Sequence, residues 1–416
     1  MIASQHLPKQ ALQRHATGPL QGVRVVDLSR LVAGNMLTLQ LGDFGADVIK
    51  VESAGAGDTL REWREPHADH PDGYDGWWRT YARNKRSLAL NLRDGQAMHW
   101  LKRLIATAQV LVESFKPGTL ENMGLSPEQL HADNPGLVIV RLSGWGQTGP
   151  YRELPGFGSL IEGFSGYAHK HRSDGGAPQL PNMALADMVT GLTGAFATLT
   201  ALREVEVRGG KGQVIDLSLL EPMLAIMGPD VSNFAATGID PEPGQKIASP
   251  RGSYRCEDGL WVSMSGSTDT MAKRVFEAIG QSALFEDPRF SSNAARLEND
   301  AELDAMVAQF MLQRTQDECL KHFRQHGVTV GPIYAPPQLI QDAHVVQRGV
   351  YVQCNARDGS EATVMHQVTP RLQGTPGSIR RAAPLRGQHT EELLSELGAS
   401  AAQCQSLKTQ GAIECR

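Results

Sequence analysis

Short apolar strands alternate with helical segments along the first 150 residues. Val23–Leu28 and Asp47–Glu52 have the composition of strands, and residues 35–44 between them have that of a helix. Strands that alternate with helices pair in parallel through right-handed crossovers, so the pattern predicts an α/β fold with a doubly wound, mainly parallel sheet. The alternation continues with strands at 87–92, 110–113 and 136–142, a helix at 95–107, and a helix that begins at Ser126 with a capping box.

A second structural unit is expected from the length of the chain. A chain of 416 residues exceeds the roughly 250–300 residues at which a single core stops growing. The proline-rich stretch at 241–251 interrupts the pattern, and a strand at 258–265 with a helix at 272–279 begins what we expect to be a smaller α/β unit.

The composition excludes several classes of protein. The net charge is −5, and no concentrated basic stripe is present, so we expect no nucleic-acid partner. The five cysteines are scattered without C-x-x-C spacing, which indicates reduced thiols. Because we find neither a signal sequence nor about 18 uninterrupted apolar residues, we expect a soluble, cytoplasmic protein without a membrane partner.

Common cofactor, metal and nucleophile motifs are not matched. The loop at 29–34 has one glycine where a dinucleotide fingerprint has three, and residues 210–212 lack the Ser or Thr of a P-loop. The histidines at 67–70 and 169–171 have no supporting ligands at zinc spacing, so we expect no metal site. Residues 163–167 do not form the G-x-S-x-G turn of serine hydrolases.

Asp187 is a carboxylate in apolar surroundings, at the start of a long helix expected from about residue 187 to 203. Met183–Ala186 precede it and Met188–Gly191 follow it. Small residues on one face of this helix predict that another backbone approaches closely. On the residue pattern alone, a helix N-cap is the favoured interpretation of Asp187. A catalytic role is compatible with it, because a carboxylate at a helix N-terminus in a dry site can be held in place and still meet an acyl group.

A resemblance to a known family extends over nearly the full length of the chain. It is carried by six segments, at 19–27, 45–52, 84–87, 112–118, 143–150 and 387–390. In this order and spacing they resemble the family III CoA-transferases, whose relatives include formyl-CoA, carnitine and dicarboxylate CoA-transferases and alpha-methylacyl-CoA racemases. The resemblance implies a homodimer of two interlocked ring-shaped subunits. In each subunit it implies a large Rossmann-like CoA-binding domain at 1–220 plus 331–416 and a small inserted α/β domain with linkers at 221–330.

The resemblance also implies the site. It places the nucleophile on Asp187 and makes a CoA thioester the substrate, with no tightly bound cofactor. Arg93 and Lys116 could supply charge to the CoA phosphates, with Arg61 and Lys85 as further candidates. The implied CoA contacts are Val32, Ala33, Leu90, Asn91, Arg93, Ser114, Phe115, Lys116, Asn122, Ser143 and Gly144. Without the resemblance, Phe115 as a core aromatic and Lys116 as a solvated lysine are equally good interpretations.

The expected reaction moves CoA between an acyl-CoA and a carboxylic acid through an aspartyl anhydride and an aspartyl-CoA thioester. Backbone amides at 144–149 are expected to stabilise the oxyanions. The segment at 249–255 resembles members that use dicarboxylates with succinyl-CoA as donor, and Arg251 or Arg255 could meet the remote carboxylate. The glycine run of formyl-CoA transferases is absent there, and Ser53–Gly55 departs from the residues that some relatives place beside adenine.

Two alternatives stay open at this stage. A racemase needs a second acid/base group, which that branch supplies from a histidine in a Gly-His-Asp segment. This chain has Gly156, Phe157 and Gly158 there, and phenylalanine cannot move a proton. The other alternative is a protein that binds acyl-CoA without turning it over.

Overall fold

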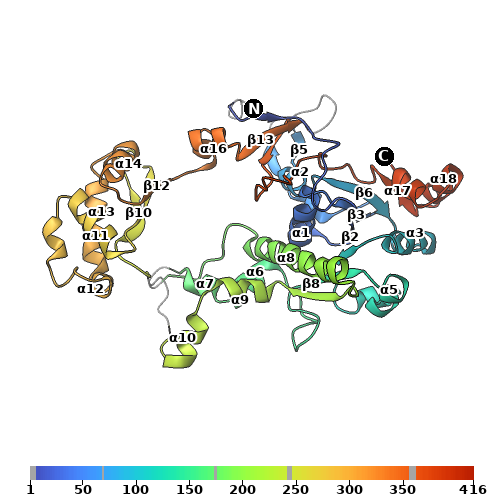
Figure 1. Ribbon diagram of the computed structural model, residues 1–416, viewed down its shortest axis with the longest axis horizontal. Coiled ribbons are helices and arrows are strands. Elements are labelled where there is room, and N and C mark those ends of the chain that lie inside the picture. The colour runs from blue at the N-terminus through green and yellow to red at the C-terminus, as the bar shows by residue number, and fades with distance from the viewer. Residues whose placement is uncertain (1–5, 68–69, 173–175, 241–245, 356–361) are drawn as a thin grey trace. The chain divides into compact units, whose positions relative to one another are not determined.

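The computed structural model describes residues 6–67, 70–172, 176–240, 246–355 and 362–416, and the chain divides into two compact units (Figure 1). The larger unit contains Leu7–Ile239 and Arg348–Arg416, and the smaller contains Asp240–Gln347 with the N-terminal Met1–His6. The borders differ from the expected 221–330. The reason is packing: helix α9 (Leu220–Ile226) packs on the long helix of the larger unit, and strand β12 (Val330–Ile333) completes the sheet of the smaller one.

A seven-stranded sheet forms the centre of the larger unit. Its order is β15-β6-β3-β2-β7-β8-β9, and every pair is parallel except β15 with β6. The chain therefore builds outward from β2 in both directions, as in a doubly wound sheet, and the predicted fold class is confirmed. The strands are β2 (Arg24–Asp27), β3 (Asp47–Ser53), β6 (Lys85–Leu90), β7 (Val110–Glu113), β8 (Val138–Ser143), β9 (Val214–Ser218) and β15 (Ile413–Glu414).

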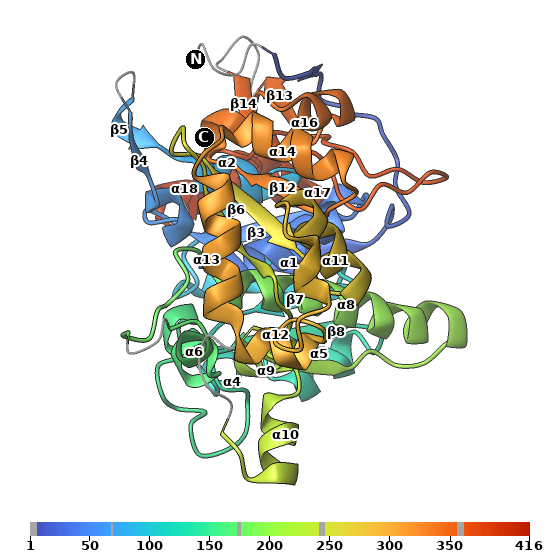
Figure 2. The ribbon, with the colours of Figure 1, turned by 90° about the vertical axis from the view of Figure 1, so that its left-hand side faces the viewer.

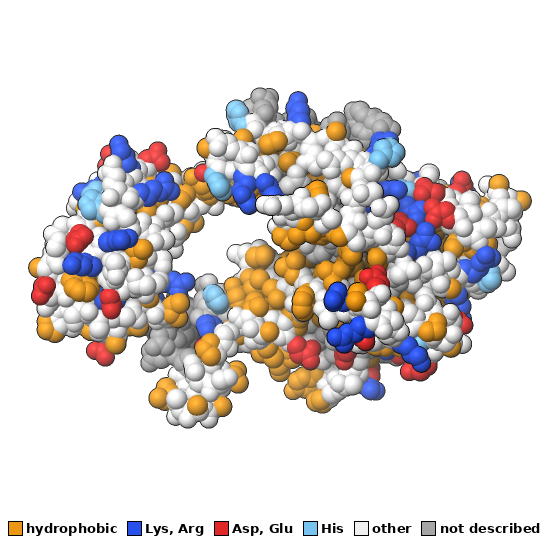
Figure 3. Space-filling model, in the orientation of Figure 1, with side chains coloured by type: hydrophobic (Ala, Val, Ile, Leu, Met, Phe, Trp, Pro, Cys, Tyr) orange, Lys and Arg blue, Asp and Glu red, His pale blue; other side chains and the backbone are white. Residues whose placement is uncertain are grey.

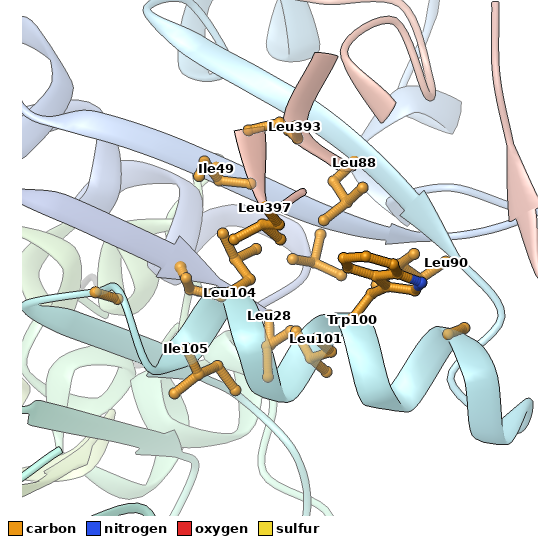
Figure 4. Close-up of a cluster of buried hydrophobic side chains, with 14 of the residues drawn as sticks. Leu28, Ile49, Leu88, Leu90, Trp100, Leu101, Leu104, Ile105, Leu393 and Leu397 are labelled. Atoms are coloured by element: carbon orange, nitrogen blue, oxygen red, sulfur yellow. The ribbon is translucent and has the colours of Figure 1, made fainter. Parts of the chain in front are cut away.

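Helices cover both faces of this sheet, because neighbouring strand residues point to opposite sides. Val25 faces the core under α1 (Leu31–Asp43) and α8 (Leu185–Arg208). Val26 faces the core under α3 (Gly95–Ile105) and α17 (Thr390–Glu396), where leucines from both ends of the chain meet (Figure 4). Leu90 of β6 lies inside this second core and is fully buried.

Helix α8 lies against α1, as Figure 1 shows, and the small residues along it explain how closely the two approach. A Cβ atom at Gly191 would lie 2.8 Å from the carbonyl oxygen of Ala33 and 2.6 Å from the Cβ of Met36. The predicted close approach of a second backbone is therefore confirmed, with α1 as the partner. By length and composition α8 could also cross a membrane, but helices of the cores of soluble proteins pass the same test.

The smaller unit packs helices on a three-stranded antiparallel sheet of order β10-β11-β12 (Figure 2). Buried Val262 and Met264 of β11 meet Val275 of α11 and Phe323 of α14. Its elements besides β12 are β10 (Arg251–Arg255), β11 (Trp261–Ser265), α11 (Asp269–Ala278), the 3-10 turn Ser282–Phe285, α12 (Asn293–Glu298), α13 (Asp300–Met311), α14 (Gln316–Gln325), α15 (Pro336–Leu339) and α16 (Ala343–Arg348), which ends at the border.

The larger unit also has a small sheet of order β1-β13-β14 and the hairpin β4-β5. These strands are β1 (Lys9–Gln10), β4 (Glu65–His67), β5 (His70–Tyr74), β13 (Tyr351–Asn355) and β14 (Ala362–His366). Its remaining helices are the 3-10 turn Thr59–Glu62, α2 (Gly76–Tyr81), α4 (Thr119–Asn122), α5 (Pro127–Asp133), α6 (Gly158–Phe164), α7 (Tyr167–Lys170), α10 (Asp230–Thr237) and α18 (Ala401–Thr409).

Candidate active site

The carboxyl ends of β2, β7 and β8 open into a cavity of about 1000 Å3 within the larger unit. The strand order reverses between β2 and β7, and open α/β sheets bind ligands in the crevice at such a switch point. Residues that follow all three strands line the cavity: Arg30 after β2, Ser114 after β7 and Gly144 after β8. The amide of Arg30 donates to Oγ of Ser114 over 3.1 Å and so joins the two loops at the switch point.

Asp187 lies at this cavity as the third residue of α8. The N-cap of the helix is Ala184, so the N-cap interpretation of Asp187 is wrong. The cap comes instead from Glu162 of α6, whose carboxylate accepts a hydrogen bond from the amide of Ala186 over 3.1 Å. Because a residue 24 positions upstream supplies it, the local sequence could not reveal this cap.

The surroundings of Asp187 favour its protonated form. Burial raises the pKa of Asp187 to about 6, and the nearby Glu162 carboxylate adds to the rise. The backbone amide of Ala33 faces the Asp187 carboxylate and lowers the pKa in part. The group is therefore a poorly solvated carboxylate that is ionised at neutral pH, which is the condition for a nucleophile.

Glycine allows the neighbouring helix α6 to approach the carboxylate. A Cβ atom on Gly158, the first residue of α6, would lie 2.4 Å from Oδ2 of Asp187. The backbone just before it also touches the loop after β8, since a Cβ on Gly144 would lie 2.3 Å from Cα of Gly156. Glycine at these three positions therefore lets β8, α6 and α8 meet around one carboxylate.

Helix α1 begins at Leu31, earlier than the residue 35 expected from the sequence. Its N-cap is Arg30, which makes no side-chain capping bond, so no capping residue marked the start. The earlier start puts Val32 and Ala33 in the first turn. Eight of the predicted site residues line the cavity: Val32, Ala33, Ser114, Phe115, Lys116, Ser143, Gly144 and Asp187.

Four of the predicted CoA contacts are not among the residues that line the cavity. Leu90 packs in the core with Trp100, so its side chain is not available to a ligand. Asn91 and Arg93 are exposed on the turn between β6 and α3. Asn122 is exposed at the end of α4.

The two further phosphate candidates have other partners. Lys85 is fully buried, and its Nζ donates to Oδ1 of Asn35 over 2.6 Å. Arg61 binds both oxygens of Glu52, at 2.7 and 2.8 Å, and stacks on Trp78. Both cations are therefore engaged inside the larger unit, because a buried charge needs a partner.

Two amides of the loop at 144–149 are also engaged. The amide of Gly146 donates to Oγ of Ser143 over 3.0 Å, and that of Gln147 donates to both oxygens of Asp216. The expectation that this whole loop offers amides to an oxyanion therefore needs correction. These two hold the loop in shape.

The sequence interpretation missed several residues of the cavity. They include the cations Arg30 and Arg152, the aromatic residues Trp63 and Trp77, and Glu162. The two tryptophan rings meet edge to face with their centroids 5.3 Å apart. Large aromatic side chains in a segment rich in charge and proline were the available signal. Among the residues that the structure describes, no group of three His, Cys, Asp or Glu could hold a metal ion.

The model of CoA-transferase family III matches residues 20–390. The chain belongs to CoA-transferase family III. This family III chain is 37% identical over 386 residues to the succinyl-CoA–D-citramalate CoA-transferase of Chloroflexus aurantiacus, covering 91% of this chain and 94% of the relative. It is 32% identical to the succinate–glutarate CoA-transferase of Agrobacterium fabrum, covering 91% and 96%.

Solved structures agree with the family assignment. The family III chain superposes on a CAIB/BAIF family protein from Brucella suis with a TM-score of 0.81 and 30% identity, covering 92% of this chain and all of that one. A protein from Mycobacterium tuberculosis gives a TM-score of 0.80 at 25% identity, covering 91% and 99%. The predicted family and enzyme class are confirmed.

Proposed function

We propose that this family III CoA-transferase moves CoA from succinyl-CoA to a dicarboxylic acid, with Asp187 as the temporary carrier of the acyl group. The observation that carries the proposal is the half-buried Asp187 carboxylate, which meets the Ala33 amide at the switch point of the sheet. The substrate class is supported by the relatives, whose names give succinyl-CoA with D-citramalate or L-malate, and succinate with glutarate.

In the first half of the reaction, an oxygen of Asp187 attacks the thioester carbonyl. The carbon–sulfur bond breaks, and CoA leaves as a thiolate while a mixed anhydride forms. The thiolate then attacks the Asp187 carbonyl of the anhydride, which releases succinate and leaves an aspartyl-CoA thioester.

The second half repeats these two steps in reverse. The acceptor carboxylate attacks the aspartyl thioester and expels CoA, and the thiolate attacks the acceptor carbonyl of the new anhydride. The new thioester leaves and the Asp187 carboxylate is regenerated. The Ala33 amide, which faces the carboxylate in the resting enzyme, is placed to donate to the oxygen that develops charge.

Cations at the cavity provide partners for the anionic ends of both substrates. Arg30 and Lys116 are exposed there, whereas the exposed Arg152 pairs with Glu153 over 3.0 Å. A carboxylate or phosphate could bind either of the first two through charge-assisted hydrogen bonds. Arg251 and Arg255, the candidates suggested by the sequence, belong to β10 of the smaller unit.

Racemase activity fits the cavity less well. Phe157, at the position where the racemase branch carries its histidine, is 62% exposed at the cavity and has no group that moves a proton. The remaining carboxylate, Glu162, is buried and bonded to the Ala186 amide.

Rapid quenching of the enzyme with succinyl-CoA alone is expected to give a covalent adduct on the peptide that contains Asp187, detected by mass spectrometry. The aspartyl-CoA thioester should then transfer its CoA to glutarate or malate. Transfer to butyrate should be about tenfold or more slower, because butyrate lacks the second carboxylate that would bind Arg30 or Lys116, and a charge-assisted hydrogen bond contributes about 1.4 kcal/mol or more. An adduct on another residue, or equal transfer to butyrate, would contradict the proposal.

We also propose a homodimer formed across α8. The outer side of this helix exposes Leu192, Phe196 and Leu199, with Phe196 72% exposed, and hydrophobic side chains gather over α6, α8 and α9 (Figure 3). Contiguous apolar surface of this kind typically marks a protein interface. The substitution Phe196→Glu is expected to convert dimers to monomers in sedimentation velocity at micromolar concentration. A wild-type monomer, or an unchanged dimer in the variant, would count against this interface.

A further inference from the structure

The turn between β2 and α1 carries the backbone amide that faces Asp187. Leu31, the first residue of α1, has a φ of 62°, a left-handed conformation that side chains other than glycine rarely adopt. The amide of Ala33, two residues later, faces the Asp187 carboxylate, and both residues line the cavity. The surrounding structure must hold Leu31 in this conformation for the amide to keep its direction.

Asp58 binds both ends of Leu31, directly and through Asn35. Its Oδ1 accepts a hydrogen bond from the Leu31 amide over 3.0 Å. Its Oδ2 accepts from Nδ2 of Asn35 over 2.8 Å, and the same nitrogen donates to the Leu31 carbonyl over 2.6 Å. The strained residue is therefore held at its N–H and at its C=O by one carboxylate and one amide.

Buried charges fix Asp58 in turn. Nζ of Lys50 lies 3.0 Å from Oδ2 of Asp58 and 3.3 Å from Oδ1 of Asp27, and Nζ of Lys85 lies 3.6 Å from Oδ2 of Asp27 and bonds to Asn35. The four charged side chains are at most 1% exposed. Buried ion pairs usually stabilise a protein no more than apolar packing of the same volume would. A network of buried charges beside a strained turn therefore indicates that it fixes the geometry of that turn.

We propose that Asp58 is a positioning residue for CoA transfer, because it locks the Leu31 turn and so aims the Ala33 amide at the Asp187 carboxylate. The inference rests on the proposed function, in which Asp187 must be ionised to attack. Without the negative charge of Asp58, the turn relaxes, and the Ala33 amide turns away from Asp187.

The pH dependence of turnover reports on the direction of the Ala33 amide. The pKa of Asp187 is raised to about 6 by burial and by Glu162, and lowered by the Ala33 amide. The other charged side chains that line the cavity are Arg30, Lys116 and Arg152. Loss of the stabilising amide beside the charged carboxylate should raise the pKa of Asp187 by about one further unit. The acid limb of kcat/KM then moves to higher pH by the same amount.

The substitution Asp58→Asn tests the proposal, with Asp43→Asn as the matched control. Asp43 is equally buried, pairs with Arg83 over 2.6 Å and accepts from Asn84 over 2.7 Å, but it lies at the other end of α1. Both variants should lower the Tm. Asp58→Asn alone should move the acid limb by about one pH unit, which makes kcat/KM about tenfold lower at pH 5. If the acid limb of kcat/KM lies at the same pH in Asp58→Asn and Asp43→Asn, the positioning role is overturned.

The substitution Asn35→Ala provides a second test should Asp58→Asn not fold. It removes the hydrogen bond to the Leu31 carbonyl and leaves the ion pairs of Asp58 and Lys50 in place. A smaller shift of the acid limb in the same direction is expected, and an unmoved limb would again overturn the proposal. Turnover by an Asp187→Asn variant would instead refute the proposed function itself, so the two failures are distinguishable.

Discussion

Replacement of Asp187 by Asn is expected to remove CoA transfer and to stabilise the protein at the same time. Loss of a covalent nucleophile typically lowers kcat by about four orders of magnitude or more. The adduct seen after rapid quenching should also disappear. A coupled assay for the new thioester, with freshly prepared protein and Asp187→Ala beside it, measures the loss.

The gain in stability follows from the pKa of Asp187. The folded-state value of about 6 lies above the ordinary value of 3.8, so the folded protein binds this proton more tightly than the unfolded chain. The ionised carboxylate therefore lowers the free energy of unfolding, increasingly as the pH rises from about 4 to 6 and constantly above that. Removing the charge should add about 2 kcal/mol to the free energy of unfolding at pH 7, a value that allows for the partial exposure of the group. At pH 3.5 it should add nearly nothing, because the carboxyl group is already protonated in the folded protein.

Urea unfolding of the wild type and of Asp187→Asn at both pH values measures this difference. Lost activity together with raised stability would show that the variant is folded and has lost only the chemical step. Wild-type turnover in the variant would show that Asp187 is not the nucleophile. A stability difference between variant and wild type that is the same at pH 7 and pH 3.5 would show that the charge of Asp187 does not destabilise the fold.

Replacement of Gly158 by Ala is expected to lower kcat by about 100-fold, the effect of displacing a reacting group by about 1 Å. The new Cβ atom would lie 2.4 Å from Oδ2 of Asp187, a distance that neither group tolerates. The carboxylate must therefore turn away from the Ala33 amide, or α6 must move.

Gly163→Ala is the control, because Gly163 lies on the same short helix and a Cβ there meets no atom within 4 Å. Its kcat should match that of the wild type, and its stability should rise by about 0.5 kcal/mol. Steady-state kinetics with both variants decides the matter. Equal kcat in Gly158→Ala and Gly163→Ala would mean that Asp187 works from another position than the one observed.

The fold was the part that the sequence predicted best. Short apolar strands alternate with helical segments in the chain itself. Neighbouring residues of one strand, such as Val25 and Val26, enter the cores on opposite faces of the sheet. The alternation of strands and helices predicted the parallel doubly wound sheet, and the spaced motifs predicted the family. The helix starts at Leu31 and Leu185 were missed, since neither Arg30 nor Ala184 makes a side-chain capping bond.

The site depended more on contacts between distant segments. The resemblance placed the nucleophile on Asp187, yet Glu162, Gly158 and the Ala33 amide meet it only in the folded chain. Lys85 resembled a phosphate ligand by sequence and is a buried partner of Asn35.

Patterns of apolar residues, turns and motifs involve neighbouring positions of the chain, and they determined the sheet and the family, through which Asp187 became the candidate nucleophile. Burial, and the pairing of charges from strands far apart in sequence, depend on which distant segments pack together and exclude water. Only the tertiary structure therefore decided the raised pKa of Asp187, the turn that Asp58 holds, and which cations remain exposed at the cavity.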